Sequence, residues 1–150
     1  MIFTIKYLTD KNLIKKIPTS ILKAEESIKT AESWLKEAHN NFEHGSFRSC
    51  IISSYLVIFH SGRAILFFDG YREKSHFAVA RYLEDKYVVN EKLLENKWID
   101  ILDYYREIRH DDQYSTSFYT SDDESEKALK NAELFLKRIK KLFDYLTDKK

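Results

Sequence analysis

Residues 46–70 read SFRSCIISSYLVIFHSGRAILFFDG, and this stretch decides the fold of the chain. Apolar side chains recur at helical spacing on opposite sides of the segment, so the pattern predicts one long helix without a polar face. Ser46 suits its start and Gly70 its end, because serine caps helix N-termini and glycine adopts the left-handed conformation that ends helices. Such a helix belongs at the centre of a helical bundle. We also expect part of it to contact a second copy of the chain, giving a homodimer. The small residues expected at that contact are Ser53, Ser54, Ser61 and Gly62.

The rest of the chain has few residues that interrupt helices, since 150 residues include only 3 Gly and 1 Pro. Apolar residues spaced three and four apart predict four more helices. We expect them from about residue 20 to 44, from Ser75 to about Tyr87, from Asn90 to about residue 110, and from Ser121 to near the C-terminus. Short connections between long helices are typical of an all-α, up-and-down antiparallel bundle, here of about five helices.

The chain is expected to form a single domain over residues 1–150, with residues 18–150 as the bundle and residues 1–17 as an N-terminal arm. In the arm, Phe3, Ile5 and Tyr7 alternate as in a short strand, although an irregular packed arm fits equally well. The segment from Asp111 to Thr120 is predicted to be a polar loop.

Composition excludes several classes of protein. A formal net charge of +1 argues against a basic coat for nucleic acid. The single cysteine, Cys50, excludes an internal disulfide and a zinc site built from several cysteines. The sequence has neither an HExxH motif nor a glycine-rich phosphate loop, so we expect no metal and no cofactor. With no signal peptide and no long uncharged apolar stretch, a cytoplasmic location without membrane contact is expected by elimination.

The stretch YYREIRHDDQY, residues 104–114, holds the strongest candidate for chemistry. On a helical wheel Arg109 falls about 40° from the centre of the apolar stripe, whereas His110 falls about 140° away, toward solvent. An arginine at the core edge needs an anionic or hydrogen-bonding partner. A structural partner would be Asp111, Asp112 or a helix C-terminal carbonyl. The functional alternative is an anion-binding arginine in a cleft between subunits, able to contact phosphate.

Two other histidines are interpreted structurally. His60 lies within the central apolar segment, which favours a hydrogen-bonded core histidine. His76 directly follows the cap residue Ser75, which favours a role in fixing the start of that helix.

Several short motifs together resemble the HEPN family, in particular its small stand-alone prokaryotic members. These proteins carry Tyr-x-x-Phe-His-x-x-x-Ala-Leu-Leu, then a glycine, then Lys-Ser-His. This chain has the similar stretch SYLVIFHSGRAIL over residues 54–66, then Gly70, then Lys-Ser-His over residues 74–76. Their next signature, Arg-x-x-x-Asp-Tyr, is echoed from Arg109 to Tyr114 with Gln113 in place of Asp, and Ala-x-x-Phe is present over residues 132–135. The resemblance covers residues from about 30 to 145 in the family's order.

The resemblance implies a helical bundle that dimerises, with many members acting as metal-independent ribonucleases through Arg, four to six residues, then His at the dimer cleft. In such chemistry His takes a proton from a ribose 2′-hydroxyl and Arg stabilises the charged phosphorane. Here four residues separate Arg109 from Tyr114, which stands where the family has His, and only three residues separate Arg106 from His110. Tyrosine, with an ordinary pKa of about 10, is a poor general base. The candidate catalytic residues are Arg109, Tyr114 and His110, and the candidate nucleotide- or RNA-binding residues are Arg106, Arg109 and Tyr114.

Three functions are therefore considered. The first is a HEPN module that binds a nucleotide or RNA and works with a minimal nucleotidyltransferase in a toxin–antitoxin-like pair, as the family implies. The second is an active metal-independent ribonuclease. The third is a helical interaction protein without a small ligand.

Overall fold

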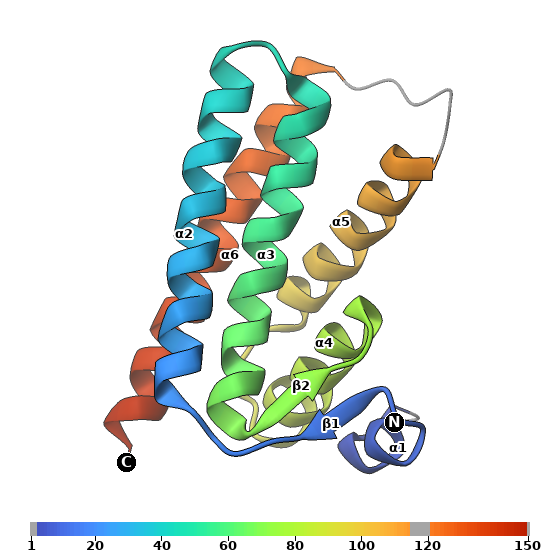
Figure 1. Cartoon of the computed structure of the whole chain (residues 1–150), viewed down its shortest axis with the longest axis vertical. Helices are drawn as coiled ribbons and strands as arrows, with labels where there is room; N and C mark the ends of the chain where they lie inside the picture. The colour runs from blue at the N-terminus through green and yellow to red at the C-terminus, as the bar shows by residue number, and fades with distance from the viewer. Residues whose placement is uncertain (1–2, 115–120, 150) are drawn as a thin grey trace.

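The computed structural model describes residues 3–114 and 121–149, and for residues 110–114 it describes the backbone only. In chain order the elements are α1 (Ile5–Asp10), β1 (Ile14–Lys16), α2 (Ile21–Glu43), α3 (Phe47–Asp69), β2 (Tyr71–Glu73), α4 (His76–Leu83), the π-helix η1 (Glu84–Asn90), α5 (Asn96–Tyr114) and α6 (Asp122–Asp148). Helices α2, α3, α5 and α6 run in alternating directions, and the short α4 packs across the lower half of the bundle (Figure 1). The predicted all-α, up-and-down bundle is confirmed.

Helix α3 is the centre of the bundle, as its sequence predicts. It packs against α2, α4, α5 and α6, and 14 of its 23 residues are buried within one chain. Between residues 52 and 67, its half-buried residues form a narrow stripe at helical spacing: Ile52, Leu56, His60, Arg63 and Phe67. Within the described residues, α3 is also the one helix long and apolar enough to cross a membrane by length and composition, but most of it is buried, as in a core helix.

The four small residues of α3, Ser53, Ser54, Ser61 and Gly62, pack inside the chain. All four are buried, and a Cβ added at Gly62 would lie 2.9 Å from Cγ1 of Val79 and 3.3 Å from Cδ1 of Leu83, both on α4. Gly62 thus allows α4 to approach α3 closely. The residues expected at a dimer contact are thus covered within one chain: α4 covers Gly62, and Asn41 of α2 donates a hydrogen bond to the Ser53 hydroxyl at 2.9 Å.

Capping explains where the long helices begin and end. The hydroxyl oxygens of Ser20 and Ser121 accept hydrogen bonds at the starts of α2 and α6. Gly70 ends α3 with φ of +91°, in the left-handed region that favours glycine. A Cβ there would also lie 2.9 Å from the carbonyl oxygen of Ile17, so the N-terminal segment can cross the end of α3 at this point.

The N-terminal arm differs from the expected strand at Phe3, Ile5 and Tyr7. Residues 5–10 form α1, because the Thr4 hydroxyl accepts the backbone N–H of Tyr7 and caps a helical turn. The strand lies later: β1 pairs antiparallel with β2, with Ile14 opposite Glu73.

The predicted boundary at Asn90 is also wrong. Asn90 ends η1, where its side-chain amide donates to the carbonyl oxygen of Asp85 at 2.6 Å, and α5 begins only at Asn96. The C-terminal end of α5 extends further than predicted, since Asp111 and Tyr114 belong to the helix, not to a polar loop.

Candidate functional site

Arg109 extends a buried row of α5. Trp98, Leu102 and Tyr105 are buried and recur four and three residues apart, and Arg109 follows four residues later. This spacing directs Arg109 toward α3, where its guanidinium carbon lies 5.6 Å from the centroid of the Tyr55 ring. A guanidinium over an aromatic face is attracted by the electron-rich ring. The wheel-based prediction that Arg109 stands at the edge of the core is confirmed.

Tyr55 and His76 form a hydrogen-bonded pair beneath this arginine. Tyr55 is fully buried, and its hydroxyl lies 2.8 Å from Nδ1 of His76, the first residue of α4. Burial raises the pKa of Tyr55, so the phenol keeps its proton and can donate it to Nδ1. The proton of the imidazole then sits on Nε2, where it is a hydrogen-bond donor.

His76 is neutral in this position. Burial lowers its pKa, and the positive charge of Arg109 lowers it further. Its ring stacks on Phe59 with centroids 3.9 Å apart, which fixes the imidazole plane. The pair can therefore present a donor to a ligand, whereas neither Tyr55 nor His76 is set up as a general base.

Arg106 and Arg81 both approach one further ring. Their guanidinium carbons are 5.6 Å and 5.2 Å from the centroid of Phe77 on α4. Asp103 accepts a short hydrogen bond from Nη2 of Arg81, and its other oxygen lies 3.6 Å from Nη2 of Arg106. We call Tyr55, His76, Phe77, Arg81, Arg106 and Arg109 the arginine–aromatic cluster.

This cluster holds more donors than acceptors. In the described part of the chain, the buried Nε atoms of Arg81 and Arg106 have no hydrogen-bond partner, and neither does Oδ1 of Asp103. Three carboxylates lie within 4 Å of Arg81 and Arg106: Asp103, Glu84 at 3.6 Å from Nε of Arg81, and Glu107 at 4.0 Å from Nη2 of Arg106. An unpaired buried donor costs about 1–3 kcal/mol, so an anion that accepts from these groups would be stabilised here.

Arg109 has no acidic partner among the side chains that the structure describes: none of their carboxylates lies within 4 Å of it. The predicted structural partners Asp111 and Asp112 lie outside those side chains, as do His110 and Tyr114. The backbone still fixes their relation on α5. Tyr114 lies five residues after Arg109, about 7.5 Å along the axis and about 140° around it.

His76 and Tyr55 belong to the arginine–aromatic cluster, although the sequence did not predict them as site residues. His76 does begin α4, as interpreted, but its ring also joins the site through Tyr55. The run Lys74-Ser75-His76 was the one available signal. His60 is not a core histidine: its ring is half-buried beside α2, and burial together with Arg63 lowers its pKa to about 4.

Among the residues that the structure describes, no group of three or more His, Cys, Asp or Glu side chains could hold a metal ion. Cys50 is buried, and burial raises the pKa of its thiol, which makes it a poor nucleophile.

Fold and site together define a small helical-bundle domain with an arginine–aromatic cluster where α3, α4 and α5 meet. The family model of the HEPN domain matches residues 24–142, and the chain belongs to the HEPN family. It is also 30% identical over 136 residues to a protein of Methanocaldococcus jannaschii named "Putative toxin MJ0605". That alignment covers 91% of this chain and 95% of the relative.

Proposed function

We propose that this chain is a HEPN module that binds a nucleotide or RNA, and that the arginine–aromatic cluster binds the phosphate. The observation that carries the proposal is Arg109, held over the buried Tyr55 ring without a carboxylate partner among the described side chains. An arginine kept at a core edge for stability alone would be expected to have such a partner. The planar guanidinium suits phosphate, because its parallel N–H groups match two phosphate oxygens.

The neighbouring groups support binding more than catalysis. Arg106 would add a second cation to the same phosphate, and the Nε2–H of neutral His76 a further donor. Tyr114 completes the proposed binding set from the last turn of α5. None of the side chains described in the cluster is poised to take a proton from a ribose hydroxyl.

A role in a toxin–antitoxin-like pair extends the proposal. It is supported by the relative named as a toxin, which aligns along nearly its whole length. We propose a minimal nucleotidyltransferase as the protein partner, a homodimer as the working form, and the cytoplasm as the location. For the dimer, Ile52 and Leu56 of the half-buried α3 stripe are the apolar side chains that one chain leaves partly uncovered.

The test is binding of a fluorescent single-stranded RNA decamer, measured by anisotropy. Arg109→Ala should weaken binding by about 1.5–3 kcal/mol, the scale of a hydrogen bond to a charged group. Arg109→Lys keeps the positive charge but loses the two parallel N–H donors of the guanidinium. It should therefore bind RNA more tightly than Arg109→Ala but more weakly than the unchanged chain. Lys29→Ala, which removes an exposed lysine of α2, is the charge-matched control. Equal losses in Arg109→Ala and Lys29→Ala would point to a helical interaction protein instead.

An active metal-independent ribonuclease is the second candidate. It is favoured by Arg106, Arg109, His110 and Tyr114 lying within nine residues of one helix, and by the relative named as a toxin. The binding proposal expects His110→Ala to change any activity little. Loss of RNA cleavage in EDTA by His110→Ala, with the assembly intact, would establish the ribonuclease instead.

A further inference from the structure

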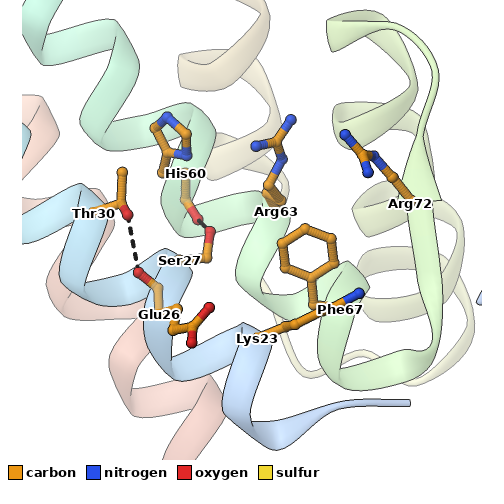
Figure 2. Close-up of a pocket in the computed structure, with 8 residues that line it drawn as sticks. All are labelled: Lys23, Glu26, Ser27, Thr30, His60, Arg63, Phe67 and Arg72. Atoms are coloured by element: carbon orange, nitrogen blue, oxygen red, sulfur yellow. Dashed lines mark hydrogen bonds between the residues drawn. The ribbon is translucent and has the colours of Figure 1, made fainter. Parts of the chain in front are cut away.

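A second cationic pocket lies away from the arginine–aromatic cluster, between α2, α3 and β2. Figure 2 shows Lys23 from α2, His60, Arg63 and Phe67 from α3, and Arg72 from β2 around this space. Its volume is about 280 Å³, near the lower end for pockets that bind small molecules. A pocket of this size suits a ligand no larger than one nucleotide.

Arg63 is the rigid wall of the pocket. Its Nε and Nη2 donate to the two carboxylate oxygens of Glu73 at 2.7 Å and 3.0 Å, and Glu73 is only 7% exposed. The guanidinium carbon lies 5.7 Å from the Phe67 centroid. The carboxylate of Glu73 therefore balances the charge of Arg63 and holds its guanidinium in place. Arg63 offers the pocket a flat guanidinium plane more than a net positive charge.

Lys23 and Arg72 provide the uncompensated charge. Both are exposed, and neither has a carboxylate within 4 Å among the residues that the structure describes. Glu26 is the one acidic residue among the lining residues, so two free cations face one carboxylate. The balance favours an anion near Arg72, which reaches the pocket from the strand opposite α2.

Phe67 gives the pocket an apolar surface, and His60 gives it a hydrogen-bonding side chain. Both rings are half-buried, so each keeps an accessible portion. The lowered pKa of about 4 keeps His60 neutral at pH 7, leaving one ring nitrogen as a donor and the other as an acceptor. Such a ring can read the edge of a base or a ribose hydroxyl, and aromatic and guanidinium planes commonly stack on bases.

From this arrangement we infer that the pocket binds one nucleoside phosphate unit, with the phosphate on Arg72 and Lys23 and the base against Phe67 and His60. The unit comes either from a free mononucleotide or from one nucleotide of an RNA strand. This site is separate from the arginine–aromatic cluster and does not depend on it.

The experiment is a ¹H–¹⁵N NMR titration of the full chain with 5′-AMP, with the RNA hexamer rA6, and with inorganic phosphate. AMP or rA6 should shift the backbone amides of Lys23, His60, Phe67 and Arg72. Arg72→Ala should raise the dissociation constant at the pocket about tenfold or more, the loss of one charged hydrogen bond. Because the backbone of Arg72 pairs with Lys15 in the sheet, truncating its side chain leaves the strand pairing in place.

Controls separate this site from the proposed function. Lys29→Ala should leave the AMP affinity unchanged, and Phe67→Leu should weaken AMP more than inorganic phosphate. If AMP and rA6 bind the pocket with equal affinity, a free mononucleotide is a sufficient ligand. If rA6 binds much more tightly than AMP, the ligand is one nucleotide of an RNA strand. Either result supports the pocket. Pocket shifts that phosphate alone reproduces, or that survive Arg72→Ala, would overturn the inference. If Arg109→Ala leaves RNA affinity unchanged, the proposed function fails while these pocket shifts remain.

Discussion

Asp69 connects the end of α3 to the α4–η1 segment, and its removal should destabilise the fold strongly. Its side chain is 6% exposed, and Oδ2 accepts hydrogen bonds from the hydroxyls of Tyr82 and Tyr87, each at 2.7 Å. Lys86 adds its Nζ at 3.4 Å. Burial and the charge of Asp69 raise the pKa of both phenols, so both hydroxyls remain donors.

The magnitude follows from these two bonds. Each hydrogen bond to a charged group contributes about 1.5–3 kcal/mol, and Asp69→Ala removes both while leaving two buried hydroxyls unpaired. Removing the cost of burying the carboxylate offsets part of this loss. We expect the free energy of unfolding to fall by about 3–4 kcal/mol, a large part of the stability of a domain of this size.

Urea unfolding followed by far-ultraviolet circular dichroism measures this change at constant m-value. Asp69→Asn keeps an acceptor oxygen and should lose about half as much. Tyr87→Phe removes the hydroxyl donor and its hydrogen bond to Asp69, but leaves no buried donor unpaired. The free energy of unfolding should fall by about 1 kcal/mol. The reasoning is refuted if Asp69→Ala costs no more than Tyr87→Phe, because the carboxylate would then be replaceable by water.

Three further predictions concern titration and assembly. The pKa of His60 is about 4 in the fold and near 6.5 in the unfolded chain, so the shift alone would lower stability by about 2.8 kcal/mol as the pH drops from 7 to 4. Because solvent screens the half-buried ring, we expect a fall of about 1–2 kcal/mol. His60→Gln should flatten that part of the pH profile of unfolding, and an unchanged slope would contradict the assignment. Arg109→Ala should raise the pKa of His76 in an NMR titration, because it removes a nearby positive charge; a lower value would be inconsistent with the contact. Light scattering at micromolar concentration should give twice 17.9 kDa, and a monomer would rule out the homodimer.

Much of the bundle was predictable because its signals are local. The starts of α2 and α6 and the end of α3 at Gly70 follow from cap residues next to apolar repeats. Ser46 stands at the start of α3 as predicted, but its side chain makes no cap hydrogen bond there. The N-terminal helix and η1 were not predictable in this way. Phe3, Ile5 and Tyr7 fit an alternating strand equally well. The π-helix η1 depends on hydrogen bonds from Asn90 to Asp85 that no helical repeat encodes.

The candidate site was predictable only in part. Helical spacing alone places Arg109 at the core edge, because that depends on α5 itself. Its partner Tyr55 lies 54 residues earlier in the sequence, on another helix, and His76 joins through that tyrosine. Contacts of this kind depend on how α3, α4 and α5 pack, which periodicity within one helix does not specify.

The most direct test of the central claim is to observe the Arg109 guanidinium while RNA binds. The side-chain Nε–Hε signals of arginine can be recorded by ¹H–¹⁵N NMR and assigned with Arg109→Lys. Arg138, which is bonded to Glu95 through Nε at 2.9 Å, serves as an internal reference. If Arg109 binds phosphate, its Nε–Hε signal shifts with rA6 concentration while that of Arg138 stays fixed. An Arg109 signal that stays in place at saturating RNA would contradict the account.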